Sequence, residues 1–254
     1  MKSTKKIFLT IVISLFVLLV LGVLVLAWRL DDVVKRAVVT VGPQITKTSV
    51  SLDSIHIGLM TGSAKVKGFI LGNPEGFASS NAISVSVAEV GVNPFTVLSK
   101  KIVIRTIHVE GPEITFEGNP FSGNNFSKLL ENVNGTAKAG GPPMTNTTAK
   151  AASKPAPKIE VDEFFITGAR VHIVATGTTI PLPEIHLTDL GKGTDGITIT
   201  DLSRRVLSAI SSATIKAVAN EAGNLGKGAT DAAGKAATEG VNKVTKGIGG
   251  LFKK

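Results

Sequence analysis

The fold class follows from residues 102–117, which read Ile-Val-Ile-Arg-Thr-Ile-His-Val-Glu-Gly-Pro-Glu-Ile-Thr-Phe-Glu. Large apolar residues occupy alternate positions on both sides of a one-residue offset between Ile104 and Ile107. Successive side chains of a β-strand point to opposite faces, so this alternation predicts a strand with one buried face. The offset predicts a β-bulge, which inserts one extra residue into a strand. Gly111 and Pro112 then mark a turn before the alternation resumes.

The same alternation recurs along most of the chain. It occurs in residues 50–57, 83–92, 114–116, 159–166, 171–173, 184–187 and 197–199. Turn-forming sequences separate many of these stretches, including Gly72-Asn-Pro-Glu-Gly76, Asn93-Pro94 and Gly118-Asn-Pro120. Short alternating stretches between such turns are typical of antiparallel strands. We therefore expect a mainly β fold built from antiparallel strands.

The amino-terminal segment has a different pattern. Residues 7–28 are 22 consecutive uncharged residues, enough helix to cross a hydrocarbon core about 30 Å thick. Lys2, Lys5 and Lys6 precede the run and favour a cytoplasmic amino terminus. The alternative is a cleaved signal peptide, whose apolar region is about 7–15 residues long and is followed by small residues at the cleavage site. Here the run is longer and ends Leu-Ala-Trp-Arg, so we expect an uncleaved single-pass anchor.

These patterns divide the chain into six segments. After the anchor we expect a short helix that Gly42-Pro43 ends. Apolar residues at helical spacing predict an amphipathic helix over 202–222 with Asp201 as its N-cap, and the many glycines of residues 223–254 weaken any helix there. The predicted segments are a cytoplasmic basic tail (1–6), a transmembrane helix (7–28), the first part of a β-sheet domain (29–134), a flexible Gly/Pro/Thr/Lys-rich insert (135–158), the second part of the β-sheet domain (159–200) and a basic Ala/Gly/Lys-rich helical tail (201–254).

The net charge of +9 is concentrated at the two ends of the chain. Residues 1–6 carry three lysines, residues 7–200 carry 16 basic and 15 acidic side chains, and residues 201–254 carry 9 basic and 4 acidic ones. A nucleic-acid-binding domain gathers basic residues on its own folded surface. The nearly neutral middle of this chain therefore argues against a nucleic-acid partner.

No pattern of catalytic or ligating residues emerges from the sequence. The chain has no cysteine, which excludes disulfides, thiolate-bound metals and cysteine nucleophiles. Each of the four histidines lies singly in a strand pattern, where we expect a solvent-facing side chain; they are His56, His108, His172 and His186. Gly191-Lys-Gly-Thr-Asp-Gly196 has the glycine spacing of a dinucleotide-binding loop, but the strand pattern of residues 197–199 follows it, so we expect a hairpin loop. We predict no catalytic, cofactor-binding or metal-binding residues, and an envelope hydrolase has only scattered Ser, His and Asp residues to support it.

Two motifs are more specific than the strand spacing. Gly68-Phe-Ile-Leu-Gly-Asn-Pro-Glu-Gly-Phe77 contains Asn-Pro-x-Gly-Phe, and Gly111-Pro-Glu-Ile114 follows the alternating stretch quoted above. Together with the anchor and Leu182-Pro-Glu-Ile-His-Leu-Thr-Asp-Leu-Gly191, they resemble the amino-terminal region of AsmA-like proteins over about residues 1–200. The resemblance implies an inner-membrane-anchored periplasmic protein with a long, curved β-sheet that forms an apolar groove, and it brings no catalytic residues.

We therefore expect a non-enzymatic AsmA-like envelope protein that assists outer-membrane assembly or handles lipid through the apolar groove. A phospholipid or another acyl-chain ligand would contact inward-facing residues, which we predict to be Ile83, Val85, Val87, Ile102, Ile104, Ile114 and Phe116. The same residues would form an ordinary closed core if a helix covered them. The alternative function is a membrane-anchored periplasmic scaffold whose basic carboxy-terminal tail binds an envelope protein partner. Both functions predict a single-pass protein of the bacterial inner membrane, with its amino terminus in the cytoplasm and its bulk in the periplasm.

Overall fold

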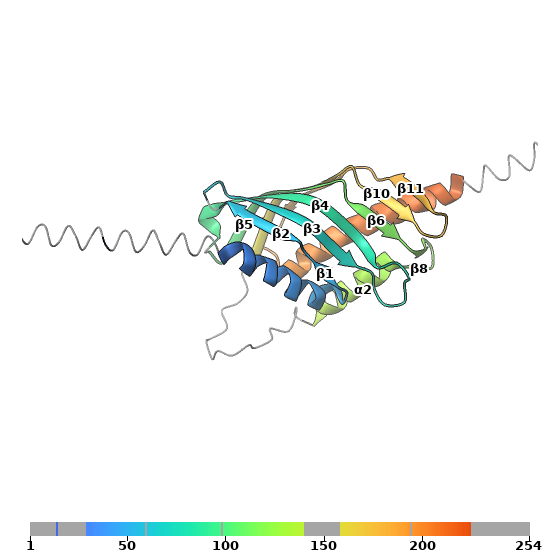
Figure 1. The fold of residues 1–254 in the computed structure, drawn as a ribbon, viewed down its shortest axis with the longest axis horizontal. Helices are drawn as coiled ribbons and strands as arrows, with labels where there is room; N and C mark the ends of the chain where they lie inside the picture. Colours follow the sequence, from blue (N-terminus) through green and yellow to red (C-terminus); the bar gives the residue numbers. More distant parts are fainter. Residues whose placement is uncertain are drawn as a thin grey trace, which may run out of the picture.

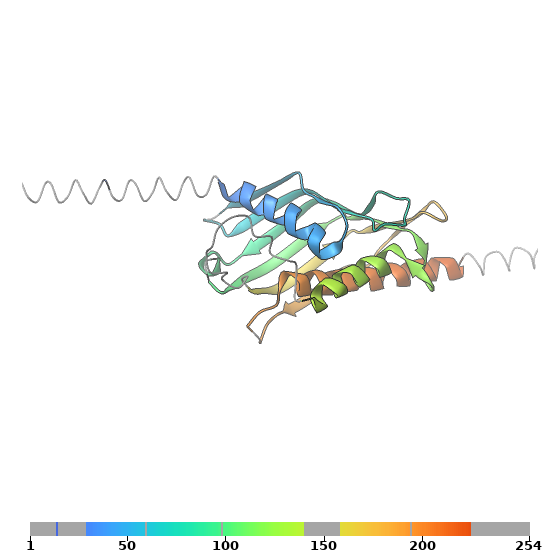
Figure 2. The ribbon, with the colours of Figure 1, turned by 90° about the horizontal axis from the view of Figure 1, so that it is seen from below.

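The computed structural model describes residue 14 and residues 29–58, 60–97, 99–139, 158–193 and 195–224. Ten described strands form one strongly curled sheet with the shape of a half-barrel (Figure 1). Helices lie against its concave face, and Figure 2 shows the carboxy-terminal helix running beside α2 there. The expected curved sheet is confirmed, whereas the fold as a whole is mixed α/β rather than mainly β.

The bounds of the elements are as follows. The strands of the large sheet are β1 (Val50–Ser51), β2 (Ser54–Gly58), β3 (Ser63–Gly72), β4 (Asn81–Val92), β5 (Lys101–Glu110), β6 (Glu113–Phe116), β9 (Lys158–Thr167), β10 (Arg170–Ile173), β11 (Thr178–Pro181) and β12 (Ile185–Leu190). β7 (Gly118–Asn119) and β8 (Gly123–Asn124) form a separate pair. The described helical segments are the amino-terminal helix (29–46), the 3-10 helix η1 (Pro94–Thr96), α2 (Asn125–Lys138) and the carboxy-terminal helix (199–224).

Two long, bent strands lie side by side in the middle of the sheet. β5 continues into β6 after a turn at Gly111, and β9 continues into β10 after a turn at Gly168. β5 pairs with β9, and β6 pairs with β10, in both cases parallel. β4 runs antiparallel to β5 and β6, and β3 pairs antiparallel with β4. Beyond the bent strands, β12 pairs antiparallel with β9, and β11 pairs antiparallel with β10.

The two parallel pairs correct the expectation of a purely antiparallel sheet. The chain between Phe116 and Lys158 contains α2 and returns to the end of the sheet where β5 begins. A parallel pair requires a long crossover of this kind, usually with a helix in it. An alternating sequence shows which side chains of a strand are buried, but it does not show which strand lies beside it.

The β-bulge predicted within residues 102–117 is confirmed. Thr106 pairs with Gly91 while Ile104 pairs with Val92, so Arg105 is the additional residue of β5. An extra residue moves the alternation by one position and bends the strand. As a result Ile104 and Ile107 both pack against the core. In a regular strand, residues three positions apart would point to opposite faces.

The amino-terminal helix does not end at Gly42-Pro43, as the sequence suggested, but continues to residue 46. Proline removes one intrahelical hydrogen bond and usually ends or kinks a helix. Here Ile45 is buried in the core, and partly buried apolar residues on the same helix pack against the core as well. A Cβ on Gly42 would lie 2.9 Å from Val50 Cγ2, so glycine also permits the close approach of this helix to β1. Tertiary packing therefore outweighs the local stop signal.

The carboxy-terminal helix is confirmed, but its start differs from the prediction. Residues 197–199 form no strand, because Ile197 makes only an isolated bridge to Ile159 and the helix begins at residue 199. Thr198 is the cap: its Oγ1 accepts the N–H of Asp201 at 3.0 Å and donates to Asp201 Oδ2 at 2.8 Å. Asp201 therefore lies in the first turn and is not the N-cap.

Helix α2 was not predicted, and it crosses the predicted boundary between the first part of the β-sheet domain (29–134) and the flexible insert (135–158). Asn124 caps it, because its side chain accepts the N–H of Ser127 at 2.9 Å. Its inner face is fully buried at Phe126, Leu129 and Val133 against the concave face of the sheet. The predicted transmembrane helix, except for residue 14, and the predicted insert and tail at residues 140–157 and 225–254 lie outside the described residues.

Candidate functional site

The residues predicted to line a groove divide into two groups. Ile83 and Val85 of β4 and Ile114 and Phe116 of β6 are buried, with exposed fractions of 7%, 7%, 1% and 1%. All four belong to the core cluster that the helices cover on the concave face. They hold the sheet and the helices together, and in this conformation they offer almost no surface to a ligand.

The remaining three predicted residues are half-buried. Ile104 packs against the edge of the core, and Ile102 lies in the same strand, paired with Ile159. Val87 of β4 is half-buried and is not among the side chains that pack against the core.

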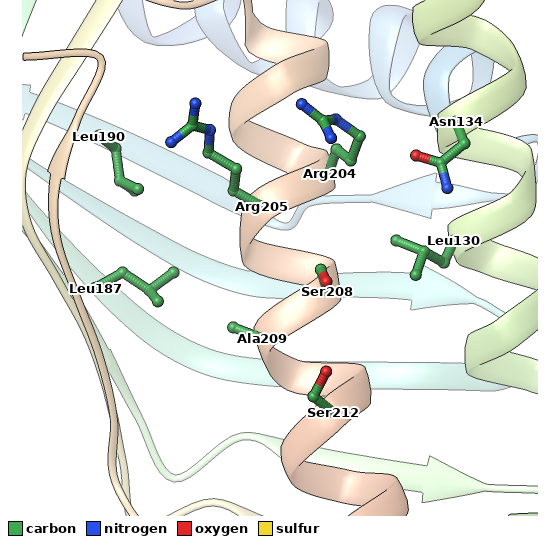
Figure 3. Close-up of a pocket in the computed structure, with 9 residues that line it drawn as sticks. All are labelled: Leu130, Asn134, Leu187, Leu190, Arg204, Arg205, Ser208, Ala209 and Ser212. Carbon is green, nitrogen blue, oxygen red and sulfur yellow. The ribbon is translucent and has the colours of Figure 1, made fainter.

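A cavity of about 480 Å³ lies on this side of the molecule, and the carboxy-terminal helix provides the middle part of its lining. α2 borders the helix on one flank, and β12 borders it on the other (Figure 3). The lining residues are Leu130, Asn134, Leu187, Leu190, Arg204, Arg205, Ser208, Ala209 and Ser212. The volume lies within the range of roughly 300–1,000 Å³ typical of small-ligand sites.

The spacing of residues on the carboxy-terminal helix explains how it lines the cavity. Residues four apart lie on one face of a helix. Arg204 and Ser208 lie toward α2, whereas Arg205 and Ala209 lie toward β12 (Figure 3). A different face of the helix, with the buried residues Leu202, Leu207, Ile210, Thr214 and Val218, packs into the core.

The cavity combines apolar walls with two positive charges. Leu130, Leu187 and Leu190 provide apolar surface, and Leu190 is itself a core residue. Arg204 Nη2 lies 3.3 Å from Asp201 Oδ1, and the hydrogen bonds from the Thr198 hydroxyl and from Arg204 hold the pKa of Asp201 below its ordinary value. Arg205 is exposed, and no ion pair joins it to any other described residue. The arrangement suits a ligand with an apolar part and an anionic group.

Sequence reasoning missed this site. It counted Arg204 and Arg205 only as part of a basic tail. The signal available in the sequence was a pair of adjacent arginines one helical turn before the small residues Ser208 and Ala209, on a segment already predicted to be helical. Nothing in that signal indicates that α2 and β12 would border the same helix.

The glycine-rich segment 191–196 joins β12 to the carboxy-terminal helix and is not a hairpin loop. Two of its glycines are explained by packing against β9. A Cβ on Gly191 would lie 2.8 Å from the carbonyl oxygen of Ile159, and a Cβ on Gly196 would lie 2.9 Å from Lys158 Cβ. These contacts account for Gly191 and Gly196 without a bound phosphate.

The histidines lie apart from the cavity. His56 Nδ1 lies 3.3 Å from Asp31 Oδ2, and His108 Nε2 lies 2.9 Å from the Thr167 hydroxyl. His186 stacks on the ring of Phe165, with centroids 4.2 Å apart. Within the described ranges, no group of three or more His, Asp or Glu residues is arranged to hold a metal ion.

Comparison with known proteins decides the family. The AsmA family model matches residues 1–179, which is most of the chain. The chain belongs to the AsmA family. AsmA proteins are generally non-enzymatic proteins of the bacterial envelope. No curated protein and no solved structure gives a significant match to the chain.

The AsmA match ends within β11, so β12 and the carboxy-terminal helix lie beyond it. The cavity is therefore built partly from the matched region, through α2, and partly from the segment that follows. Among the residues that the structure describes, no helix is long and apolar enough to span a membrane.

Proposed function

We propose that this AsmA protein is a non-enzymatic lipid-handling protein of the envelope, which holds an acyl chain of an anionic lipid in the cavity beside its carboxy-terminal helix. The observation that carries the proposal is the pairing of apolar walls with Arg204 and Arg205 in one cavity of about 480 Å³. Leucine side chains contact the methylene groups of the chain, and the guanidinium group of Arg205, which forms no ion pair with any described residue, binds the acidic headgroup.

The burial of the predicted groove residues supports this smaller site over a continuous open trough. Phe116 and Ile114 are 1% exposed, so an acyl chain would have to displace a helix to reach them. The cavity needs no such displacement, because it is already open beside the helix (Figure 3). In this proposal the sheet is the scaffold and the carboxy-terminal helix carries the ligand-binding surface.

The same proposal places the protein in the inner membrane with its bulk in the periplasm. Its support is the uncharged run over residues 7–28, the lysines that precede it, and membership of an envelope family. There the protein would contribute to outer-membrane assembly by holding lipid on the periplasmic side.

The test is the lipid that accompanies the full chain when it is purified from bacterial membranes in mild detergent. Mass spectrometry would compare the wild type with Ala209→Trp, which fills the cavity, and with Ala222→Trp, a matched control at an exposed position near the end of the same helix. Circular dichroism would verify that all three proteins are folded.

We expect wild type and Ala222→Trp to retain the same acidic lipid, and Ala209→Trp to retain severalfold less. Wild-type protein without stoichiometric lipid would contradict the proposal. Equal lipid in both tryptophan variants would show that lipid binds elsewhere on the protein.

A further inference from the structure

Two loop tips and the beginning of the amino-terminal helix meet at one end of the half-barrel. The helix is held there because Asp31 Oδ1 accepts the N–H of Ile57 at 2.9 Å, directly before the β2–β3 turn. The β2–β3 turn contacts the β4–β5 connection, since Val92 N–H donates to the Gly62 carbonyl oxygen at 2.6 Å. Figures 1 and 2 both show η1 and the first turn of the helix at this end.

This end exposes large apolar side chains. Met60 in the β2–β3 turn is 100% exposed, and Phe95 in η1 is 93% exposed. Val97 follows η1 and is 37% exposed, and Val33 on the second turn of the helix is 58% exposed. Single exposed apolar residues are common on soluble proteins, but a fully exposed Met and Phe on adjoining tips indicate a contact surface.

Basic side chains surround these tips. Lys100 and Lys158 are exposed and adjacent, because Lys158 N–H donates to the Lys100 carbonyl oxygen at 2.9 Å. The carboxylate of Glu160 nearby is paired with Lys101 at 2.6 Å. Further exposed charges here are Arg29, Arg105 and Asp32. A surface of apolar tips with surrounding lysines and arginines is typical of proteins that lie on an anionic lipid interface.

The sequence identifies which lipid surface is within reach. The uncharged run over residues 7–28 ends one residue before Arg29, and Arg29 begins the helix at this same end. A membrane that held residues 7–28 would therefore lie at this end of the domain.

We propose that Met60 and Phe95 insert into the interface of the membrane that anchors the chain, and that Lys100, Lys158 and Arg105 bind its acidic headgroups. The inserted tips and the anchor together fix the orientation of the domain. Four strands begin or end at these loops and therefore lead away from the bilayer, namely β3, β4, β5 and β9. The proposal rests on the predicted anchor and is independent of lipid in the cavity.

The absence of native cysteine makes a direct test available. Single cysteines would be introduced in the full chain as Met60→Cys and Phe95→Cys, with Phe121→Cys as the control. Phe121 is 80% exposed in the turn between β7 and β8, and Figure 1 shows β8 at the opposite end of the molecule. Each variant, labelled with an environment-sensitive fluorophore, would be reconstituted into nanodiscs containing about one-third acidic phospholipid, with and without spin-labelled lipid as a quencher.

The expected result is blue-shifted emission at positions 60 and 95 and quenching by spin-labelled lipid at least twofold stronger than at position 121. Water-like, weakly quenched emission at all three positions would overturn the proposal. Blue-shifted emission at 60 and 95 without quenching would also overturn it, because the tips would then contact protein rather than lipid.

Discussion

Asp31 of the amino-terminal helix accepts the backbone N–H of Ile57 in β2, with 2.9 Å between Oδ1 and N. The other oxygen of the same carboxylate lies 3.3 Å from His56 Nδ1. One helical turn later, Lys35 Nζ donates to the carbonyl oxygen of Asp53 at 2.6 Å. The helix that follows the predicted anchor is therefore attached to the sheet region by hydrogen bonds from its side chains to the backbone of residues 53 and 57, as well as by its apolar face. This attachment fixes the loop tips relative to the anchor.

Replacing Asp31 with alanine should loosen this attachment. Removal of a carboxylate that accepts a backbone N–H costs about 1 kcal/mol at a partly exposed position, because the N–H of Ile57 then loses its partner. Hydrogen exchange should show faster exchange of the Ile57 amide and little change in β9. Asp32→Ala is the matched control, since Asp32 is exposed on the same turn. Equal exchange in both variants would show that the apolar contacts alone hold the helix.

Glu117 should make stability depend on pH. Partial burial raises the pKa of Glu117, and hydrogen bonds from the N–H groups of Ala78 and Ser79 lower it. The lowering outweighs the raising, so the pKa of Glu117 lies below the ordinary value of 4.5. The carboxylate accepts these bonds at 2.6 Å and 2.9 Å and so holds the β3–β4 connection against the end of β6.

A lowered pKa means that the carboxylate stabilises the fold fully above about pH 4.5 and loses that contribution as the pH falls through the folded-state pKa. Glu117→Gln should reduce the free energy of unfolding at pH 7 by about 1 kcal/mol and flatten its decline in acid. Urea unfolding at several pH values measures both. Glu113→Gln, at an exposed carboxylate 3.5 Å from Arg170, should change stability much less. An unchanged acid profile in Glu117→Gln would contradict this role.

Gly111 should be required for the bend between β5 and β6. Its φ is +57°, in the left-handed region that side chains disfavour, and no atom lies within 4 Å of the position of an added Cβ. Gly111→Ala should therefore cost about 1 kcal/mol through backbone strain alone. Gly123→Ala has equally open surroundings and no positive φ, so it should be nearly neutral in the same thermal unfolding experiment.

Arg205 should determine headgroup preference more than stability. Its side chain is exposed at the cavity, so reversing its charge should leave the melting temperature nearly unchanged. Arg205→Glu should lower the ratio of acidic to zwitterionic lipid retained during purification severalfold. Lys216→Glu makes the same charge change at an exposed position of the same helix, outside the cavity lining, and should leave the ratio unchanged. A matching loss in both variants would indicate general electrostatics rather than a site.

The sequence was most informative where one residue's neighbours along the chain determine its role. Alternation predicted the faces of the strands, and the offset between Ile104 and Ile107 located the bulge at Arg105. It was least informative where distant segments meet. The parallel pairing of β5 with β9 depends on the path of the chain through α2, and the cavity requires Leu130, Leu187 and Arg205 to come together from three elements. Gly42-Pro43 failed as a stop signal for a similar reason, because Ile45 gains burial only once the sheet is present.

A photoreactive residue in β12 would test the lipid site most directly. Leu187 lines the cavity, whereas the next residue, Thr188, is exposed and points to the other face of the strand. A photo-crosslinking amino acid would be placed at either position in the full chain, irradiated in bacterial membranes and analysed by intact-protein mass spectrometry. Lipid bound in the cavity predicts a phospholipid adduct at position 187 and little at position 188. No lipid adduct at 187, or equal adducts at both positions, would contradict lipid binding in the cavity.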